Sequence, residues 1–136
     1  MFEVIHEFAV LGTTCFMMAL ATVWYSPMMF GAVWMREARL TDEMVEKAKS
    51  DMWKHMVLTF ISYTIMLGLL ALMVVYAPVL ALTPMQASGL LALFVAAVAV
   101  PTTLFEGRSL TYYGIQVGFW ILFIIIGTYI LQYWPW

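Results

Sequence analysis

Four long apolar runs, separated by shorter polar connections, dominate the pattern of residues along the chain. They cover about residues 8–25, 56–77, 85–105 and 110–133. Each run has about 18–25 residues, the length of an α-helix that crosses a hydrocarbon core of roughly 30 Å. The connection between the second and third runs is short, so these helices must be antiparallel neighbours. We therefore predict an all-α integral membrane protein whose four transmembrane helices form an antiparallel bundle.

The longest polar stretch, residues 26–55, separates the first two runs. Ser26 followed by Pro27 is typical of an N-cap and a first helical position, which predicts a short interfacial helix over about residues 27–38. Thr41 and the acidic pair after it predict a second helix start. Apolar residues then recur at helical spacing, with no Gly or Pro, into the second run. We predict one long helix, in which an amphipathic extension leads into the second span.

Proline, glycine and hydroxyl residues mark the other helix ends. Thr83 and Pro84 predict the start of the third span. Pro101 removes a backbone hydrogen bond and predicts a kink near the end of that span. Gly107 suits a left-handed helix end, and Ser109 suits the N-cap of the fourth span. The third connection is therefore predicted to be a tight turn.

All six basic residues lie in two of the three connections. Five lie between the first and second runs, and one lies between the third and fourth: Arg36, Arg39, Lys47, Lys49 and Lys54, then Arg108. In a four-span protein these two connections share one side of the membrane, and basic residues near span ends mark the cytoplasmic side. We predict that both connections are cytoplasmic and that both termini lie outside.

Composition supports the same class. The chain is 65% hydrophobic and 10% charged, whereas a soluble domain averages about 45–50% apolar and about 25% charged residues. The four spans and segment 26–55 use the whole length, so we expect a single domain over residues 1–136. The sequence has no run of basic residues of the kind that a nucleic-acid-binding protein needs, so we expect no nucleic-acid partner. The single cysteine, Cys15, allows no internal disulfide.

We expect no cofactor, metal site or catalytic centre. His6, with Glu3 and Glu7, would lie across the membrane from His55, too far for a shared metal ion. No set of nucleophile and base can be assembled on one side, so the protein is not expected to be an enzyme. No ionisable residue lies near the middle of a span, where ion- and proton-coupled carriers usually keep one.

The predicted topology brings one group of aromatic and charged residues to the inner membrane face. These residues are Trp24, Tyr25, Ser26, Phe30 and Trp34, together with Glu106 and Arg108. One interpretation is an aromatic-walled pocket closed by the charged pair. The other is an interfacial anchor beside a packed turn. A cation–π contact between Arg108 and a Trp or Tyr fits both interpretations.

Small residues at helical spacing predict close helix packing. Gly114 and Gly118 form such a pair on the fourth span, and the third span carries a ridge of Ser88, Ala92 and Ala96. Packing within one bundle and packing between subunits fit this pattern equally well. Gln116, a lone amide between the two glycines, is expected to hydrogen-bond across helices rather than to bind a solute.

Two motifs resemble a bacterial membrane family. The segment Trp24–Met35 matches WYSPxxFGxxWM, and residues 105–110 read FEGRSL. Together they resemble the family called "domain of unknown function 1761", over nearly the full chain. The resemblance implies a four-helix integral membrane protein and no activity. We expect the protein to lie in the bacterial cytoplasmic (inner) membrane.

Two functions fit these observations. The first is a non-enzymatic protein that acts by association, as a homo-oligomer or as an accessory subunit of a larger membrane complex. The alternative is a transporter or channel that binds a small solute or lipid at the cytoplasmic mouth. Its site would lie near Trp24, Tyr25, Glu106 and Arg108. The lipid bilayer is the partner common to both.

Overall fold

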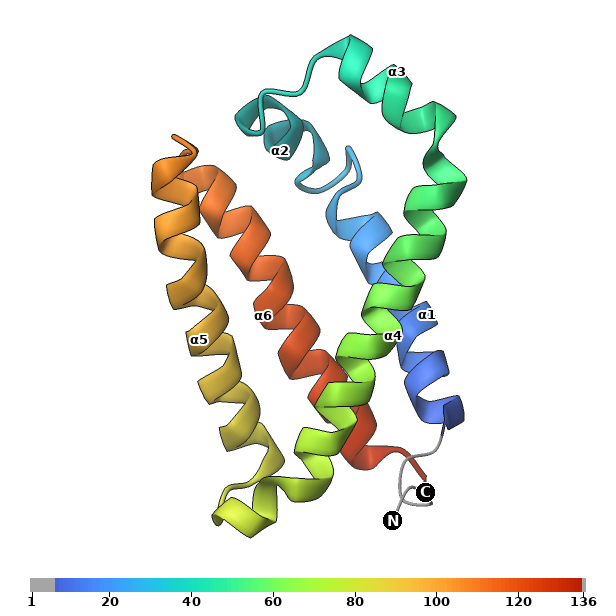
Figure 1. The fold of residues 1–136 in the computed structure, drawn as a ribbon, viewed down its shortest axis with the longest axis vertical. Helices are drawn as coiled ribbons and strands as arrows, with labels where there is room; N and C mark the ends of the chain where they lie inside the picture. Colours follow the sequence, from blue (N-terminus) through green and yellow to red (C-terminus); the bar gives the residue numbers. More distant parts are fainter. Residues whose placement is uncertain (1–6, 136) are drawn as a thin grey trace.

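The computed structural model describes residues 7–135, and no strand occurs among them. The helices are α1 Glu7–Trp24, α2 Gly31–Glu37, α3 Asp42–Ser50, α4 Met52–Tyr76, α5 Pro84–Phe105 and α6 Leu110–Tyr133, with a 3-10 turn η2 Ala77–Leu80 after α4 (Figure 1). Four of them, α1, α4, α5 and α6, are long and apolar enough to cross a membrane. The predicted all-α membrane fold and its four spans are confirmed.

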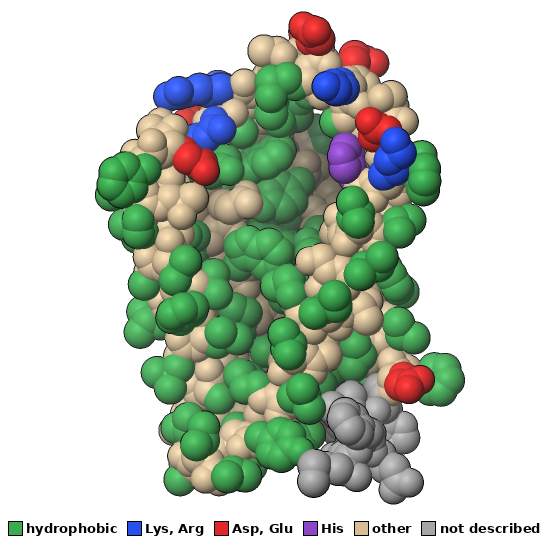
Figure 2. All heavy atoms as spheres, viewed as in Figure 1, with side chains coloured by type: hydrophobic (Ala, Val, Ile, Leu, Met, Phe, Trp, Pro, Cys, Tyr) green, Lys and Arg blue, Asp and Glu red, His purple; other side chains and the backbone are tan. Residues whose placement is uncertain are grey.

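The four long helices alternate in direction, so α1 begins and α6 ends at the same end of the molecule (Figure 1). Helices α2 and α3 and the turn at 106–109 lie at the opposite end. We call this the charged end, because the Lys and Arg side chains gather there (Figure 2). The two connections that carry basic residues therefore share one end, as an antiparallel arrangement requires.

Helix α6 is the centre of the bundle. It contacts α1, α2, α4 and α5, and it is the most buried of the four spans. Phe119 and Phe123 on α6 are fully buried against Met17 and Leu67. Helices α4 and α5 meet at η2 and diverge toward the charged end, so they form two walls beside α6 (Figure 1).

The outward faces of the spans are apolar. Leu58, Ile65, Leu93 and Phe94 each expose more than half of their surface. Such side chains are stable when they face lipid chains rather than water. Inside the bundle, the hydroxyl of Thr13 donates to the carbonyl of Ala9 at 2.7 Å, whereas the buried Thr128 hydroxyl has no hydrogen-bond partner among the described residues. The protein is embedded in the membrane, with these faces in contact with lipid.

The predicted helix start at Ser26 and Pro27 is wrong. Residues 25–30 form consecutive turns, and α2 begins only at Gly31. The Ser26 hydroxyl donates back to the carbonyl of Val23 at 2.7 Å, so it does not cap α2. The chain folds tightly here because the Ser26 carbonyl accepts the amide of Gly31 at 2.9 Å.

The predicted continuous helix from Thr41 into the second span is also wrong. Helix α3 ends at Ser50, and Asp51, with φ −106° and ψ 16°, interrupts the helix before α4. The side chain of Asp51 pairs with Lys54 at 2.8 Å. None of the residues of α3 is buried, so no packing holds it in line with α4, and it lies across the charged end (Figure 1).

The other predicted helix ends are confirmed. Thr41 accepts the amide of Met44, and Thr83 forms a capping box with Gln86. Gly107 has a φ of +65°, and Ser109 accepts the amide of Tyr112 at 3.1 Å. Helix α5 continues through Pro101 to Phe105, and the predicted kink stays a prediction.

The small-residue ridges pack inside the chain at most positions. Ser88 and Ala92 are buried in α5, whose largest contact is with α6, and the carbonyl of Ala96 accepts the Tyr113 hydroxyl at 2.7 Å. A Cβ on Gly118 would lie 3.4 Å from the ring of Trp24.

The glycine with the closest neighbours on α6 is not the predicted one. Nothing lies within 4 Å of a Cβ placed on Gly114. The predicted close helix packing at Gly114 is therefore not found among the described residues. A Cβ on Gly127 would lie 3.0 Å from both Leu67 and Leu70. Gly127 therefore leaves the room in which two leucine side chains of α4 pack against α6.

Candidate functional site

The turn at 106–109 is fastened to the end of α2 by three hydrogen bonds. The guanidinium of Arg108 donates to the carbonyl of Ala38, and the hydroxyl of Ser109 donates to the carboxylate of Glu37. Arg39 in turn donates to the carbonyl of Gly107 at 3.1 Å. We call this set the α2 latch. It closes the charged end over α6.

Glu106 and Arg108 are neighbours but not a tight pair. Arg108 Nε lies 3.7 Å from a Glu106 carboxylate oxygen, too far for a strong hydrogen bond. The guanidinium lies 5.4 Å from the centre of the Tyr112 ring, a cation–π contact of the predicted kind. Arg108 therefore acts mainly in the latch, whereas Glu106 lines a cavity.

Three of the predicted inner-face residues pack the protein rather than line a cavity. The indole N–H of Trp24 donates to the carbonyl of Ile115 at 3.2 Å, and its ring lies 4.5 Å from that of Phe30. Ser26 bonds to its own turn. Trp24, Ser26 and Phe30 thus fix the turn between α1 and α2 against α6.

The other two, Tyr25 and Trp34, converge on Gln116 of α6. The Tyr25 hydroxyl donates to Gln116 Oε1 at 3.2 Å, and the Trp34 indole N–H donates to the same oxygen at 3.1 Å. The prediction that Gln116 hydrogen-bonds across helices is confirmed. These bonds bring the start of the first connection, α2 and α6 to one point.

A cavity of about 720 Å³ lies beside this point, between α4 and α6. We call it the aromatic lobe, because five aromatic side chains line it: Tyr25, Trp34, Tyr63, Phe119 and Trp120. His55, Thr59 and Ser62 on α4 supply its polar edge. Figure 2 shows the hollow below the charged residues, with apolar side chains in its floor.

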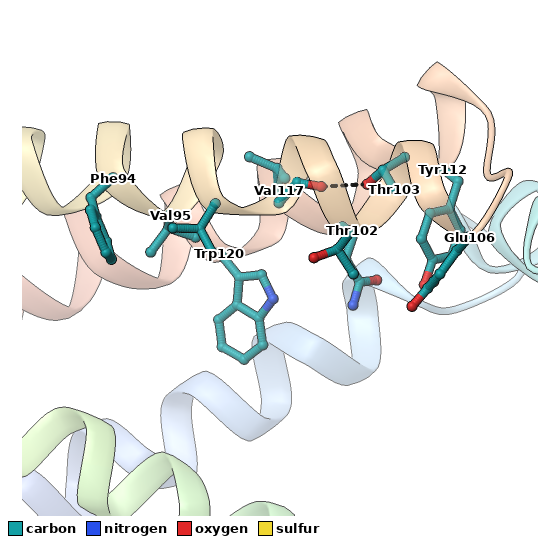
Figure 3. Close-up of a pocket in the computed structure, with 11 residues that line it drawn as sticks. Phe94, Val95, Thr102, Thr103, Glu106, Tyr112, Val117 and Trp120 are labelled. Atoms are coloured by element: carbon teal, nitrogen blue, oxygen red, sulfur yellow. Dashed lines mark hydrogen bonds between the residues drawn. The ribbon is translucent and has the colours of Figure 1, made fainter.

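A second cavity of about 350 Å³ lies along α5 and α6, and we call it the threonine lobe. Thr102, Thr103 and Glu106 line it with the ring of Trp120 (Figure 3). The Thr103 hydroxyl donates to the carbonyl of Ala99 at 2.7 Å and is already satisfied. Gln116 and Trp120 line both lobes, so the two cavities are adjacent.

A third cavity of about 250 Å³, the apolar lobe, lies farther from the charged end between α4 and α5. Only apolar side chains line it: Met66, Leu69, Leu70, Met73, Leu91, Val95, Phe123 and Ile124. Val95 is shared with the threonine lobe. The threonine lobe shares lining residues with each of the other two, and all three lie along α6, so we refer to them together as the α4–α5 groove.

The groove contains some of the predicted site residues and several that sequence reasoning missed. Tyr25, Trp34 and Glu106 border it. The missed residues Tyr63 and Trp120 lie within spans, where an aromatic residue looks like ordinary core. The neighbouring Gln116 was the available signal, since an amide inside a span needs partners.

Metal-ligating side chains do not gather in the described part of the chain, where no group of three or more His, Cys, Asp or Glu is found. Glu3 and His6, considered above, lie outside the described residues. The groove offers hydroxyls, one amide, one imidazole, one carboxylate and aromatic rings as groups that could contact a ligand.

The family comparison agrees with the resemblance of the two motifs. The model of the family described as "Protein of unknown function (DUF1761)" matches residues 8–132. No match was found among the curated proteins or among the solved structures. The match extends from the start of the first span almost to the end of the last, and the chain belongs to the DUF1761 family.

Proposed function

We propose that this protein is a non-enzymatic membrane protein that takes an amphipathic molecule from the bilayer into the α4–α5 groove. The observation that carries the proposal is the change of lining along α6. Near the charged end the lining includes Gln116 and Ser62, whereas farther away it is entirely apolar. An amphipathic molecule presents the same change from its polar head to its chain.

The size and position of the groove support this proposal. The two larger lobes, of about 720 and 350 Å³, are comparable with the pockets that bind small molecules, about 300–1,000 Å³. The apolar lobe follows α4 from Met66 to Met73, about 10 Å at the rise of an α-helix. The hollow is open on the face seen in Figure 2, so a molecule dissolved in lipid reaches it sideways.

A native mass spectrum of the gently extracted protein tests the proposal. We expect the 15.5 kDa chain to carry a small-molecule adduct. Ser62→Trp fills the aromatic lobe and should remove the adduct. Ile61→Trp is the matched control, because Ile61 is 49% exposed on the same helix and lines none of the three lobes. An adduct retained equally by both variants would contradict groove binding.

Association is the second candidate function, as a homo-oligomer or as an accessory subunit. The wholly apolar lining between α4 and α5 favours it, since a helix of another subunit also buries apolar surface there. Ser88, Ala92 and Gly118 already pack inside the chain, so the groove is the proposed contact. In the native spectrum, multiples of 15.5 kDa or reproducible larger subunits would support this candidate.

We also propose that the charged end faces the cytoplasm of a bacterial inner membrane, with both termini outside. Five of the six Lys and Arg residues lie in the two connections at that end, and Lys54 lies in the first turn of α4 beside them. Basic residues near span ends favour the cytoplasmic side. The polar part of the groove would then open near the inner leaflet.

A further inference from the structure

The amide of Gln116 has a fixed orientation. The indole N–H of Trp34 only donates hydrogen bonds, so the Gln116 atom 3.1 Å away must be the carbonyl oxygen. That oxygen also accepts the Tyr25 hydroxyl at 3.2 Å, which uses both of its lone pairs. Among residues 7–135, the NH₂ group has no hydrogen-bond partner. Gln116 lines both the aromatic and the threonine lobe, so its two amide donors are free to bond an acceptor on a ligand.

The charges around the groove complement neither an anion nor a cation. No Lys or Arg lines the aromatic or the threonine lobe. The carboxylate among the lining residues is that of Glu106, which is 53% exposed and lies 3.7 Å from Arg108. A charged head group that moved from water into the groove would find no full counter-charge there, so its desolvation would cost free energy. The lining favours an uncharged head group.

The aromatic lobe offers flat surfaces to such a head group. The rings of Tyr25 and Trp34 pack edge to face with centroids 5.2 Å apart, as do those of Tyr63 and Trp120 at 6.1 Å, and all four rings line the lobe. Aromatic faces favour stacking with another planar ring. They also favour a cation, but a simple ammonium group would leave the Gln116 donors without an acceptor.

We infer that the ligand is an apolar chain attached to a planar, uncharged ring that bears carbonyl or ether oxygens, the chemical class of membrane quinones. This inference rests on the proposed groove binding. The ring lies in the aromatic lobe and accepts hydrogen bonds from Gln116, and the chain follows the apolar lobe between α4 and α5.

Four probes that share a decyl chain test this inference: a decyl benzoquinone, monodecanoylglycerol, decyltrimethylammonium and decyl phosphate. Each is titrated calorimetrically into the full-length protein in nanodiscs, with empty nanodiscs as the partition control. We expect the quinone to bind about tenfold tighter than each of the others, the effect of about 1.4 kcal/mol. Equal affinities, or tighter binding of a charged probe or of the glyceride, overturn the inference.

Two variants identify the groups responsible. Gln116→Glu keeps the acceptor oxygen for Trp34 and Tyr25 but removes the NH₂ donors. It should weaken quinone binding about tenfold and strengthen binding of the trimethylammonium probe. Trp120→Leu should also weaken quinone binding. The matched control is Trp53→Leu, because Trp53 is 66% exposed and lines none of the three lobes.

The two proposals fail in different ways. A native adduct that Ser62→Trp removes, together with no preference for the quinone, overturns the head-group class and leaves groove binding intact. A wild-type protein without an adduct that binds none of the four probes contradicts both. Unchanged quinone affinity in Gln116→Glu overturns the assigned role of the amide.

Discussion

At the scale of single residues, Gly31 has the least free space of the described glycines. A Cβ placed on it would lie 2.3 Å from the carbonyl oxygen of Tyr25 and 2.7 Å from the backbone of Ser26. These neighbours are backbone atoms, so they cannot rotate away as a side chain would. Gly31 is therefore required by the turn that positions Tyr25 and Trp34 around Gln116.

We predict that Gly31→Ala lowers the free energy of unfolding by about 1–3 kcal/mol, the usual cost of overpacking. Gly114→Ala is the matched control, because an added Cβ there meets nothing within 4 Å. In a helix interior, alanine is about 1 kcal/mol more favourable than glycine. Thermal unfolding in detergent measures both variants. Equal midpoints would contradict the tight turn.

At the scale of elements, the α2 latch decides how the charged end is closed. Glu37 supplies the side-chain acceptor of the latch, whose other two acceptors are backbone carbonyls, and its side chain is 25% exposed. The hydroxyl of Ser109 that it accepts also caps α6. Neutral hydrogen bonds contribute about 0.5–1.5 kcal/mol and those to a charged group about 1.5–3 kcal/mol. Losing Glu37 should therefore loosen both α2 and the turn at 106–109.

We predict that Glu37→Ala increases hydrogen–deuterium exchange in α2 and in residues 106–112, with little change in α1 and α4. Arg36→Ala is the control, since it removes only the ion pair of Arg36 with Glu37 at 3.6 Å, and the Arg36 side chain is 72% exposed. Equal exchange in the two variants would mean that the latch does not hold the turn.

At the scale of the whole molecule, the orientation of the groove depends on which side of the membrane holds the charged end. Lys47 lies on α3 at that end, whereas Leu82 lies between η2 and α5 at the opposite end. Cysteines at these two positions, in a Cys15→Ser background, report the orientation directly. A membrane-impermeant thiol reagent is the probe.

We predict that intact cells label Leu82→Cys, and that Lys47→Cys is labelled only after the membrane is opened. The reason is the excess of Lys and Arg at the charged end. The Cys15→Ser chain alone gives the background. The reverse labelling pattern would place the polar part of the groove outside the cell.

The sequence by itself determined the fold class, the four spans and most helix ends, because these depend on local patterns. Apolar run length predicts a spanning helix, and Thr83 and Ser109 cap their helices by bonds to residues close in sequence. The tertiary structure decided that α2 begins at Gly31 and that the helix is interrupted at Asp51. The local sequence had predicted a helix start at Ser26 and Pro27 and one continuous helix through Asp51.

The groove also required the tertiary structure. Gln116 is 91 positions from Tyr25 and 82 from Trp34, and the three residues meet only because α2 folds back onto α6. Tyr63 and Trp120 line a cavity because α4 and α5 diverge on either side of α6. The length of an apolar run identifies a span. Only the packing of the helices decides which face of that span contacts another helix and which face lines a cavity.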